Sequence, residues 1–263
     1  MTNPPAAGPL PIHGQMSRLT RGIEWSCMVI AMGLVIWHIV RFAVTDVLWI
    51  WWSPIPILLG MIGADFGSGL MHWAADTWAS ETMPVLGKRF VRPFRVHHVN
   101  PDDLLDRDVI DTNGDVAMIE ILFLLLALWF PLTKVWGQAA ALGLVAFCVC
   151  GLPTNQVHQW AHLKNPPRLV RQLQAWGLIL SRNAHQKHHA APYVVNYCIA
   201  TGWCNPLLTA SRFFPRMEAL VSRITGLQPR HDDRSFAHSV FEARSEAAAN
   251  PRLAEPTPGG SSA

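Results

Sequence analysis

The chain has 263 residues, of which 50% are hydrophobic and only 15% are charged, and its formal net charge is +3. Soluble globular domains carry roughly 25% charged residues, so this composition indicates an integral membrane protein. The modest positive charge is distributed over loops rather than along one face, which argues against nucleic-acid binding. The five cysteines lie in or near apolar segments without a CxxC pair, so we interpret them as small buried side chains rather than a disulfide framework.

Both ends of the chain have compositions typical of disordered segments. Residues 1–23 begin with a Pro-, Ala- and Gly-rich stretch that lacks the apolar core of a signal peptide. Residues 229–263 end in a run of Ala, Pro, Gly and Ser. We therefore predict one domain at residues 24–228, flanked by two mostly disordered tails.

Four apolar stretches of this domain are long enough to cross a membrane. A bilayer core about 30 Å thick requires about 20 mostly apolar residues in a helix. We predict spans at about residues 25–44, 49–73, 116–136 and 138–157. The predicted fold class is all-α, a polytopic membrane protein with about four transmembrane helices.

The positive charges of the loops orient these spans. The tail before the first span, the long loop between the second and third spans and the C-terminal part hold most of the Lys and Arg residues. The two short loops hold only Arg41 and Lys134. Because cytoplasmic loops carry an excess of positive charge, both termini are predicted to be cytoplasmic. The Ala-, Arg- and Pro-rich tails favour a bacterial inner membrane over the endoplasmic reticulum.

The segment after the fourth span has two stretches that we expect at the membrane interface. Residues 168–180 place Leu169, Leu173 and Trp176 on one stripe of an amphipathic helix. Residues 193–210 are apolar but contain Gly, Asn and Pro, so we do not expect them to span the membrane.

Histidine is clustered in this chain. The spacing of His158 and His162 puts two imidazoles on one helical face, and His185, His188 and His189 form an HxxHH pattern. A His-His pair and a single intramembrane histidine lie earlier in the chain, at His97, His98 and His72. All eight histidines fall on the predicted cytoplasmic face, which favours one His-rich cap over several unrelated solvated or structural histidines.

The number of histidines favours two metal ions. A catalytic zinc takes three protein ligands, whereas two metals about 3.5–4 Å apart would use all eight. The chain has no HExxH motif for a zincin mechanism, and no GxSxG, P-loop or GxGxxG motif. We therefore expect a redox site with two iron ions, cycling between Fe2+ and Fe3+, that reacts with O2.

Polar residues near these motifs are candidates for orienting the ligands. Asp65 and Asp76 share a helical face with His72, at three- and four-residue steps that include Ser68. Ionisable groups at membrane depth are expensive and usually functional, although a polar seam between helices is the alternative. The full set predicted to support the ligands is Asp65, Asp76, Asn113, Asp115 and Asn155.

These motifs resemble the Kua/CarF family, the plasmanylethanolamine desaturases, which also includes a plant plastid lipid desaturase. The resemblance covers about residues 60–228 and is carried by Ala-Asp-Phe at 64–66, Gly-Leu-Met-His-Trp at 69–73, Arg-Pro-Phe-Arg-Val-His-His at 92–98, Asp-Thr-Asn-Gly-Asp at 111–115, Thr-Asn-Gln-Val-His-Gln-Trp-Ala-His at 154–162, His-Gln-Lys-His-His at 185–189 and Thr-Gly-Trp at 201–203. Asp111 stands where the family pattern has Glu.

The resemblance implies a lipid desaturase domain at residues 24–228 with all eight histidines as iron ligands. The implied reaction converts the 1-O-alkyl chain of a plasmanyl phospholipid, expected to be plasmanylethanolamine, to the 1-O-alk-1′-enyl chain of a plasmalogen, with O2 reduced to water. The chain has no flavin or haem motif, so an external electron donor such as cytochrome b5 or a ferredoxin is expected.

Three alternatives remain open at this point. The same site could desaturate an acyl chain. A membrane zinc hydrolase acting on lipid amides or esters would need only three of the histidines. A membrane scaffold or signalling module would hold its metal for structural reasons alone.

Overall fold

The computed structural model describes residues 17–79, 83, 87, 91–190 and 193–229. Every regular element within these residues is a helix, which confirms the all-α prediction. Helix α1 (Arg18–Val44) begins inside the segment predicted to be a disordered tail, because Ser17 Oγ caps it by accepting a hydrogen bond from the Thr20 N–H at 3.1 Å. Most of the two predicted tails lies outside the described residues.

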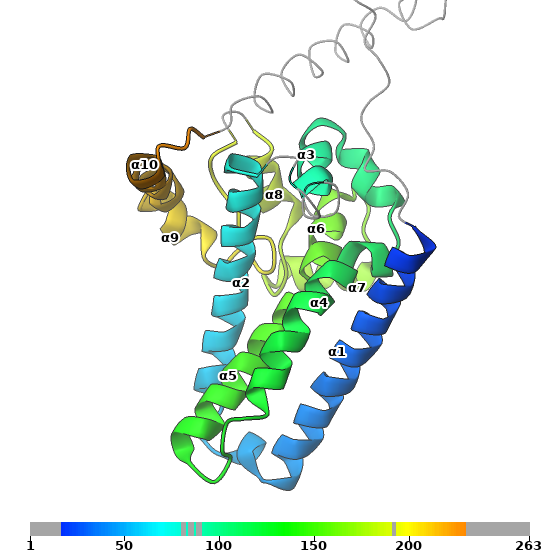
Figure 1. Cartoon of the computed structure of the whole chain (residues 1–263), viewed down its shortest axis with the longest axis vertical. Coiled ribbons are helices and arrows are strands. Elements are labelled where there is room, and N and C mark those ends of the chain that lie inside the picture. Colours follow the sequence, from blue (N-terminus) through cyan, green and yellow to red (C-terminus); the bar gives the residue numbers. More distant parts are fainter. Residues whose placement is uncertain (1–16, 80–82, 84–86, 88–90, 191–192, 230–263) are drawn as a thin grey trace, which may run out of the picture.

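Four long helices run up and down and form the body of the molecule (Figure 1). They are α1, α2 (Pro54–Thr77), α4 (Val109–Ala127) and α5 (Val135–Gly151), with a short 3-10 turn, η1 (Val47–Trp49), before α2. Helix α2 packs on α5, α5 on α4, and α4 on α1, so the helices lie in the spatial order α2–α5–α4–α1. Their exposed sides carry large apolar residues, as expected for surfaces in contact with lipid.

Three helical segments of the described chain are long and apolar enough to cross a membrane. They are α1, α2 and the stretch Val135–His162, in which α5 continues past Pro153 into α6 (Thr154–His162). Helix α4 has 19 residues and is not among them. It lies within the same bundle, and its role as a fourth span stays a prediction.

The bounds of α4 differ from the predicted span at 116–136. Asp108 caps the helix by accepting hydrogen bonds from the N–H groups of Ile110 and Asp111, so α4 begins at Val109. Hydropathy did not predict these first two turns as part of the span, because they contain the charged residues Asp111 and Asp115. The helix also ends earlier, at Ala127.

The close approach of α2 and α5 depends on glycine. A Cβ at Gly60 would lie 2.1 Å from the Gly143 carbonyl oxygen, so only glycine lets the two backbones meet there. Small residues at helix contacts are characteristic of membrane bundles, in which packing rather than the hydrophobic effect drives association. This contact fixes α2 against the helix that leads into α6.

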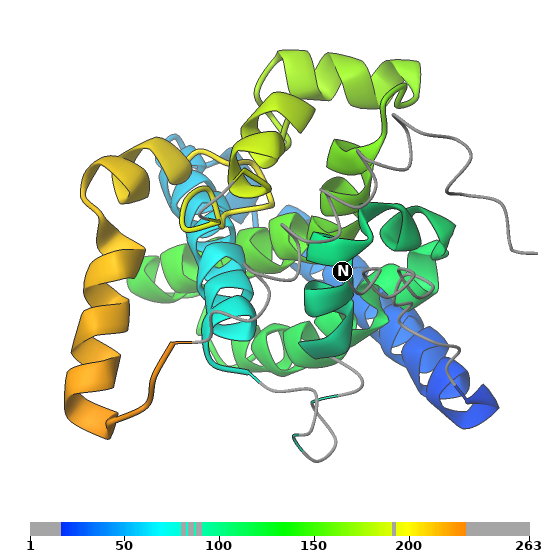
Figure 2. The same ribbon diagram turned by 90° about the horizontal axis from the view of Figure 1, so that it is seen from above.

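The remaining helices form a cap at one end of the bundle, the upper end in Figure 1. They are α3 (Arg92–Val99), η3 (Pro101–Asp106), α6, α7 (Arg168–Ala175), α8 (Arg182–His188), α9 (Asn205–Ala210) and α10 (Phe213–Thr225). Figure 2 shows α10 on one side of the bundle and α1 on the opposite side. Residues 92–99, predicted to be loop, are helical, and α7 is shorter than the predicted 168–180 because Gly177 adopts a positive φ of 68°.

We expect Gly60→Leu to destabilise the bundle by about 3 kcal/mol, the upper end of the cost of overpacking, because the obstructing atom is a backbone carbonyl that cannot rotate away. The matched control is Gly33→Leu in α1, since nothing lies within 4 Å of a Cβ at Gly33. Thermal unfolding in detergent compares the two proteins. Equal melting temperatures would contradict the assigned α2–α5 contact.

Candidate metal centre

Eight histidines from four helices and their flanks converge in the cap. Helix α2 contributes one, α3 and α6 contribute two each, and the α8 segment contributes three. Their ring nitrogens form two groups in which all nitrogens lie within 4.8 Å of one another: His97, His158, His162, His185 and His189 in the first, and His72, His97, His98 and His188 in the second. These are the eight histidines singled out in the sequence, and His97 belongs to both groups.

The local sequence places the rings on the inner faces of their helices. His158 and His162 are one turn apart on α6, and the Gln159 amide between them donates to the carbonyls of Leu104 (2.7 Å) and Arg107 (2.8 Å). Helix α8 is capped by Ser181, whose hydroxyl accepts a hydrogen bond from the Ala184 N–H at 3.2 Å. These anchors fix the angle at which each helix presents its imidazoles.

The first group has nitrogen separations that suit one shared cation. His185 Nε2 lies 2.9 Å from His158 Nε2, 2.8 Å from His162 Nε2 and 2.9 Å from His189 Nε2. Two nitrogens bound to one metal ion at about 2.1 Å and at right angles to each other would be about 3.0 Å apart. One His185 proton can serve only one of the three contacts, whereas a cation satisfies every lone pair.

The second group has its tautomers set by backbone carbonyls. His72 Nδ1–H donates to the Tyr197 carbonyl at 3.1 Å, and His188 Nδ1–H donates to the Val195 carbonyl at 2.9 Å. A carbonyl can only accept, so the proton of each neutral ring lies on Nδ1 and the lone pair lies on Nε2. His188 Nε2 in turn lies 3.1 Å from His98 Nε2. Both rings are therefore held as metal ligands usually are.

Asp76 lies on the ligand side of these rings rather than behind them. Its Oδ2 is 3.3 Å from His72 Nε2, 3.3 Å from His98 Nε2 and 3.5 Å from His188 Nε2. This oxygen is buried and has no hydrogen-bond partner within the described chain, and the same holds for His72 Nε2 and His97 Nε2. Buried polar atoms of this kind are costly unless something satisfies them. A cation among them does so, and the residues fit a metal ion.

Asp65 supports the site through the backbone. Its Oδ1 accepts hydrogen bonds from the N–H groups of Thr201 (2.8 Å) and Gly202 (2.7 Å), and its Oδ2 accepts one from the Cys204 N–H (2.9 Å). These bonds fasten residues 201–204 to α2, next to the Tyr197 carbonyl that orients His72. Asp65 would therefore act on the ligand His72 indirectly, by holding the loop that carries the Tyr197 carbonyl. Its role in orienting the ligands stays a prediction.

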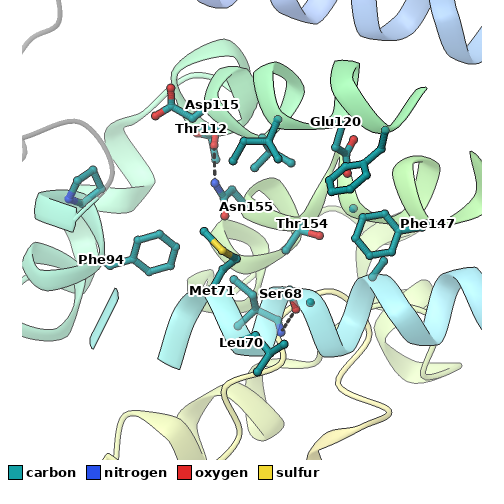
Figure 3. A pocket seen from close by; sticks show the side chains of 18 of the residues that line it. Ser68, Leu70, Met71, Phe94, Thr112, Asp115, Glu120, Phe147, Thr154 and Asn155 are labelled. Carbon is teal, nitrogen blue, oxygen red and sulfur yellow. Dashed lines mark hydrogen bonds between the residues drawn. The ribbon is translucent and has the colours of Figure 1, made fainter. Parts of the chain in front are cut away.

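The other predicted supporting residues join α4 to α6. Asn155 Nδ2 donates to the Thr112 carbonyl at 2.9 Å, a bond drawn in Figure 3, and Asn113 Oδ1 accepts from the Gln156 N–H at 3.1 Å. Asp115 lines a cavity beside the site. Asn113 and Asn155 thus set the position of the helices rather than of individual rings.

Several groups that shape the site could not be predicted from the sequence. The carbonyls of Val195 and Tyr197 orient two ligands, yet any residue has a carbonyl and none can be recognised in a sequence. The backbone around these carbonyls is unusual, because Tyr193 and Asn196 adopt positive φ values of 60° and 58°. Asn196 also donates its side-chain N–H to the Ala184 carbonyl of α8 at 2.9 Å.

Of the four other histidines, the described part of the chain includes only His38, which lies outside both histidine groups. His38 is fully buried between α1 and α4, where its Nε2 lies 3.0 Å from the Leu124 carbonyl. His13, His231 and His238 lie outside the described residues.

Burial keeps the cap histidines neutral. The pKa values of His97, His185 and His189 lie well below the ordinary histidine value, chiefly because burial disfavours the imidazolium ion and further because neighbouring imidazoles would repel it. Burial also lowers the pKa of His188, although Asp76 opposes the shift. Neutral imidazole is the form that binds a metal.

The sequence of this chain is similar to those of known lipid desaturases. Residues 61–232 match the model of the lipid desaturase domain family. The chain is 41% identical to the plasmanylethanolamine desaturase of Myxococcus xanthus over 215 residues, which cover 81% of this chain and 76% of that protein. It is 36% identical to plasmanylethanolamine desaturase 1 of Mus musculus, covering 82% of this chain and 83% of that protein.

A plant relative is similar over a shorter stretch. The chain is 37% identical to chloroplastic fatty acid desaturase 4 of Arabidopsis thaliana over 66% of its own length and 54% of the length of that protein. No solved structure matches the chain.

We expect the metal-free protein to become less stable on acidification. Folding lowers the pKa of several cap histidines below the unfolded value of about 6.5, so below that pH the unfolded chain binds more protons than the folded chain. The melting temperature of metal-free protein in detergent should fall between about pH 7 and pH 5. His189→Gln, which has one titrating group fewer, should show a smaller fall. A melting temperature independent of pH would contradict the assigned burial.

Proposed function

Because the chain belongs to the lipid desaturase family, we propose that it is a desaturase of ether phospholipids. Family membership makes it a membrane-bound oxidoreductase that acts on a lipid with O2. The proposed substrate is a plasmanyl lipid, with plasmanylethanolamine as the first candidate, and the product is the corresponding plasmalogen. The observation that carries the proposal is the convergence of all eight motif histidines, together with Asp76, in the cap of a chain that aligns with named plasmanylethanolamine desaturases over most of their lengths.

The proposed cofactor is a pair of iron ions, one in each histidine group. His158, His162, His185 and His189 would hold one ion, and His72, His98 and His188 would hold the other, with His97 available to either. We further assign Asp76 as a carboxylate ligand of the second ion, because its Oδ2 faces three Nε2 atoms of that group. A buried carboxylate offsets part of the positive charge that two metal ions bring into a cap of neutral imidazoles.

The reaction requires an oxidant because the alkyl C–H bonds next to the ether oxygen are far too weakly acidic for a side-chain base near pH 7. Iron held by these histidines would supply this oxidising power with O2. The alkyl chain of the lipid loses two hydrogens as the double bond forms. O2 is reduced to two waters with two further electrons and two protons. The protein excludes bulk water from the cap, since His97, His185 and His188 are each at most 2% exposed. It also holds the rings of His72 and His188 in one tautomer.

Electrons must come from a partner, which we propose to be cytochrome b5 or a ferredoxin. Such a carrier must reach the metal centre, so the cap would have to face the compartment in which the carrier occurs. The distribution of Lys and Arg favours a cytoplasmic cap with both termini on the same side. We propose the bacterial inner membrane as the location.

An acyl-lipid desaturase is the second candidate, and the similarity to chloroplastic fatty acid desaturase 4 favours it specifically. It would use the same histidines on a different chain of the lipid. A zinc hydrolase would leave most of the converging imidazoles without a use.

The product of the reaction separates these candidates. The chain is expressed in cells that contain 1-O-alkyl phospholipids but no plasmalogens, and the lipids are analysed before and after acid treatment. We expect acid-labile vinyl ethers to form in air and to be absent without O2 or in His188→Ala cells. A new acyl double bond without any vinyl ether would favour the second candidate.

Metal analysis tests the ligand assignment. The purified protein should contain about two irons per chain, and Asp76→Asn or His158→Ala should each lower this to about one and abolish turnover, because each removes a ligand from one ion only. His38→Gln, which changes a buried histidine outside the site, serves as the control and should retain both irons. About one zinc per chain, with turnover independent of O2, would refute the di-iron assignment.

A further inference from the structure

A cavity of about 350 Å³ lies between α2 and α4. Both helices pack on α5, while they make few contacts with each other, so a space remains between them. Figure 3 shows Ser68, Leu70 and Met71 on one side of this space, with Asp115, Thr112 and Glu120 on the other. Its volume falls within the range of small-molecule sites, about 300–1,000 Å³.

The two ends of the cavity differ in polarity. Near the cap it is lined by Arg107, Thr112 and Asn155, whereas further along the bundle it is lined by Phe123 and Phe147. The rings of these two phenylalanines meet edge to face, with centroids 5.6 Å apart. Thr112 and Phe123 are eleven residues apart on α4, so the cavity extends about 16 Å along the helix axis. A polar end and an apolar end suit an amphiphile.

The polar end of the cavity adjoins the metal centre. A smaller void of about 30 Å³ is lined by His97 and His158, which both belong to the first histidine group. Phe94, Thr112 and Asn155 line both the small void and the large cavity. The cavity therefore leads to the histidine that belongs to both metal groups.

A buried carboxyl group lies in the wall of this apolar space. Glu120 is 3% exposed, and its Oε2 has no hydrogen-bond partner within the described residues. Its Oε1 occupies the place where a side chain at position 151 would begin, since a Cβ on Gly151 would be 2.2 Å away. Glycine at 151 thus allows the carboxyl to lie against α5 and leaves the centre of the cavity open.

We propose that this cavity binds one hydrocarbon chain of the lipid substrate, with the head end of the chain at His97 and His158 and its methyl end at Phe123 and Phe147. Gly151 keeps the cavity open by accommodating the Glu120 carboxyl. The inference rests on the proposed function for the identity of the lipid, and it deepens that function by naming the residues that select the chain.

The orientation of the cavity agrees with the bond that is oxidised. The cavity extends from the cap toward the apolar end of the bundle, so the carbons beside His97 are those closest to the polar head. In a 1-O-alkyl lipid these are the carbons next to the ether oxygen, where the vinyl ether forms. Oxidation in the middle of a chain would require the chain to continue beyond the histidines.

The binding test uses a 1-O-alkyl phosphatidylethanolamine that carries a photoreactive diazirine at the methyl end of its chain. Irradiation of the protein in detergent needs neither iron nor turnover. We expect crosslinks to the α4 and α5 segments that contain Phe123 and Phe147. Competition by an unlabelled lipid of the same chain length should remove them.

The selectivity test compares Gly151→Ala with the double variant Gly151→Ala/Glu120→Ala. The single variant should displace the flexible Glu120 side chain into the cavity, so longer alkyl chains should be converted less well, by about fourfold for each methylene excluded. The double variant should restore the conversion of longer alkyl chains, because no carboxyl remains to be displaced. Leu122→Ala, at a residue of α4 that is 68% exposed, is the control and should not change the chain-length preference.

The two tests distinguish this inference from the proposed function. Vinyl ether formation with crosslinks outside α4 and α5, or with a chain-length preference unaffected by Gly151→Ala, would overturn the chain site and leave the function standing. Crosslinks in the cavity that are lost in Gly151→Ala and regained in the double variant, without any vinyl ether formed by the wild-type protein, would support the chain site and overturn the function.

Discussion

The structure depends on the packing of eight imidazoles, six buried and two half-buried, whose nitrogens face one another. Lone pairs brought together in a water-free cap repel unless something positive lies between them, and single protons cannot satisfy every contact of His185. A cation among these nitrogens would relieve the repulsion, and the orphaned atoms of His72, His97 and Asp76 lie in the same place. The rest of the fold holds these rings in position against the repulsion between their lone pairs.

The supports of the site are mainly backbone groups. Carbonyls of residues 195 and 197 orient His188 and His72, and Asp65 fastens the following residues to α2 through three N–H groups. Backbone groups of a fastened loop lose little further freedom when a metal binds. This gives the cap pre-organised ligands although its segments lie more than a hundred residues apart in the chain.

The bundle and the cap are linked mechanically at two places. Gly60 allows α2 to approach α5 closely, and α5 continues into α6, which carries His158 and His162. Asn113 and Asn155 connect the start of α4 to the same helix. The helices that surround the cavity are therefore the helices that position the ligands, and a lipid chain held between α2 and α4 has a fixed relation to the metal centre.

Local patterns in the sequence were sufficient for the helical fold class, the apolar stretches of α1, α2 and α5, and the identity of the converging histidines, because helical spacing and hydropathy are properties of neighbouring residues. Hydropathy alone misplaced the start of α4, which depends on the Asp108 cap. Only the tertiary structure decided that His97 lies in both groups and that Asp76 faces the ligand nitrogens. The same holds for the carbonyls that orient His72 and His188 and for the position of Glu120 against Gly151. These relations join residues far apart in the chain, and the groups that make them have no distinguishing pattern in a sequence.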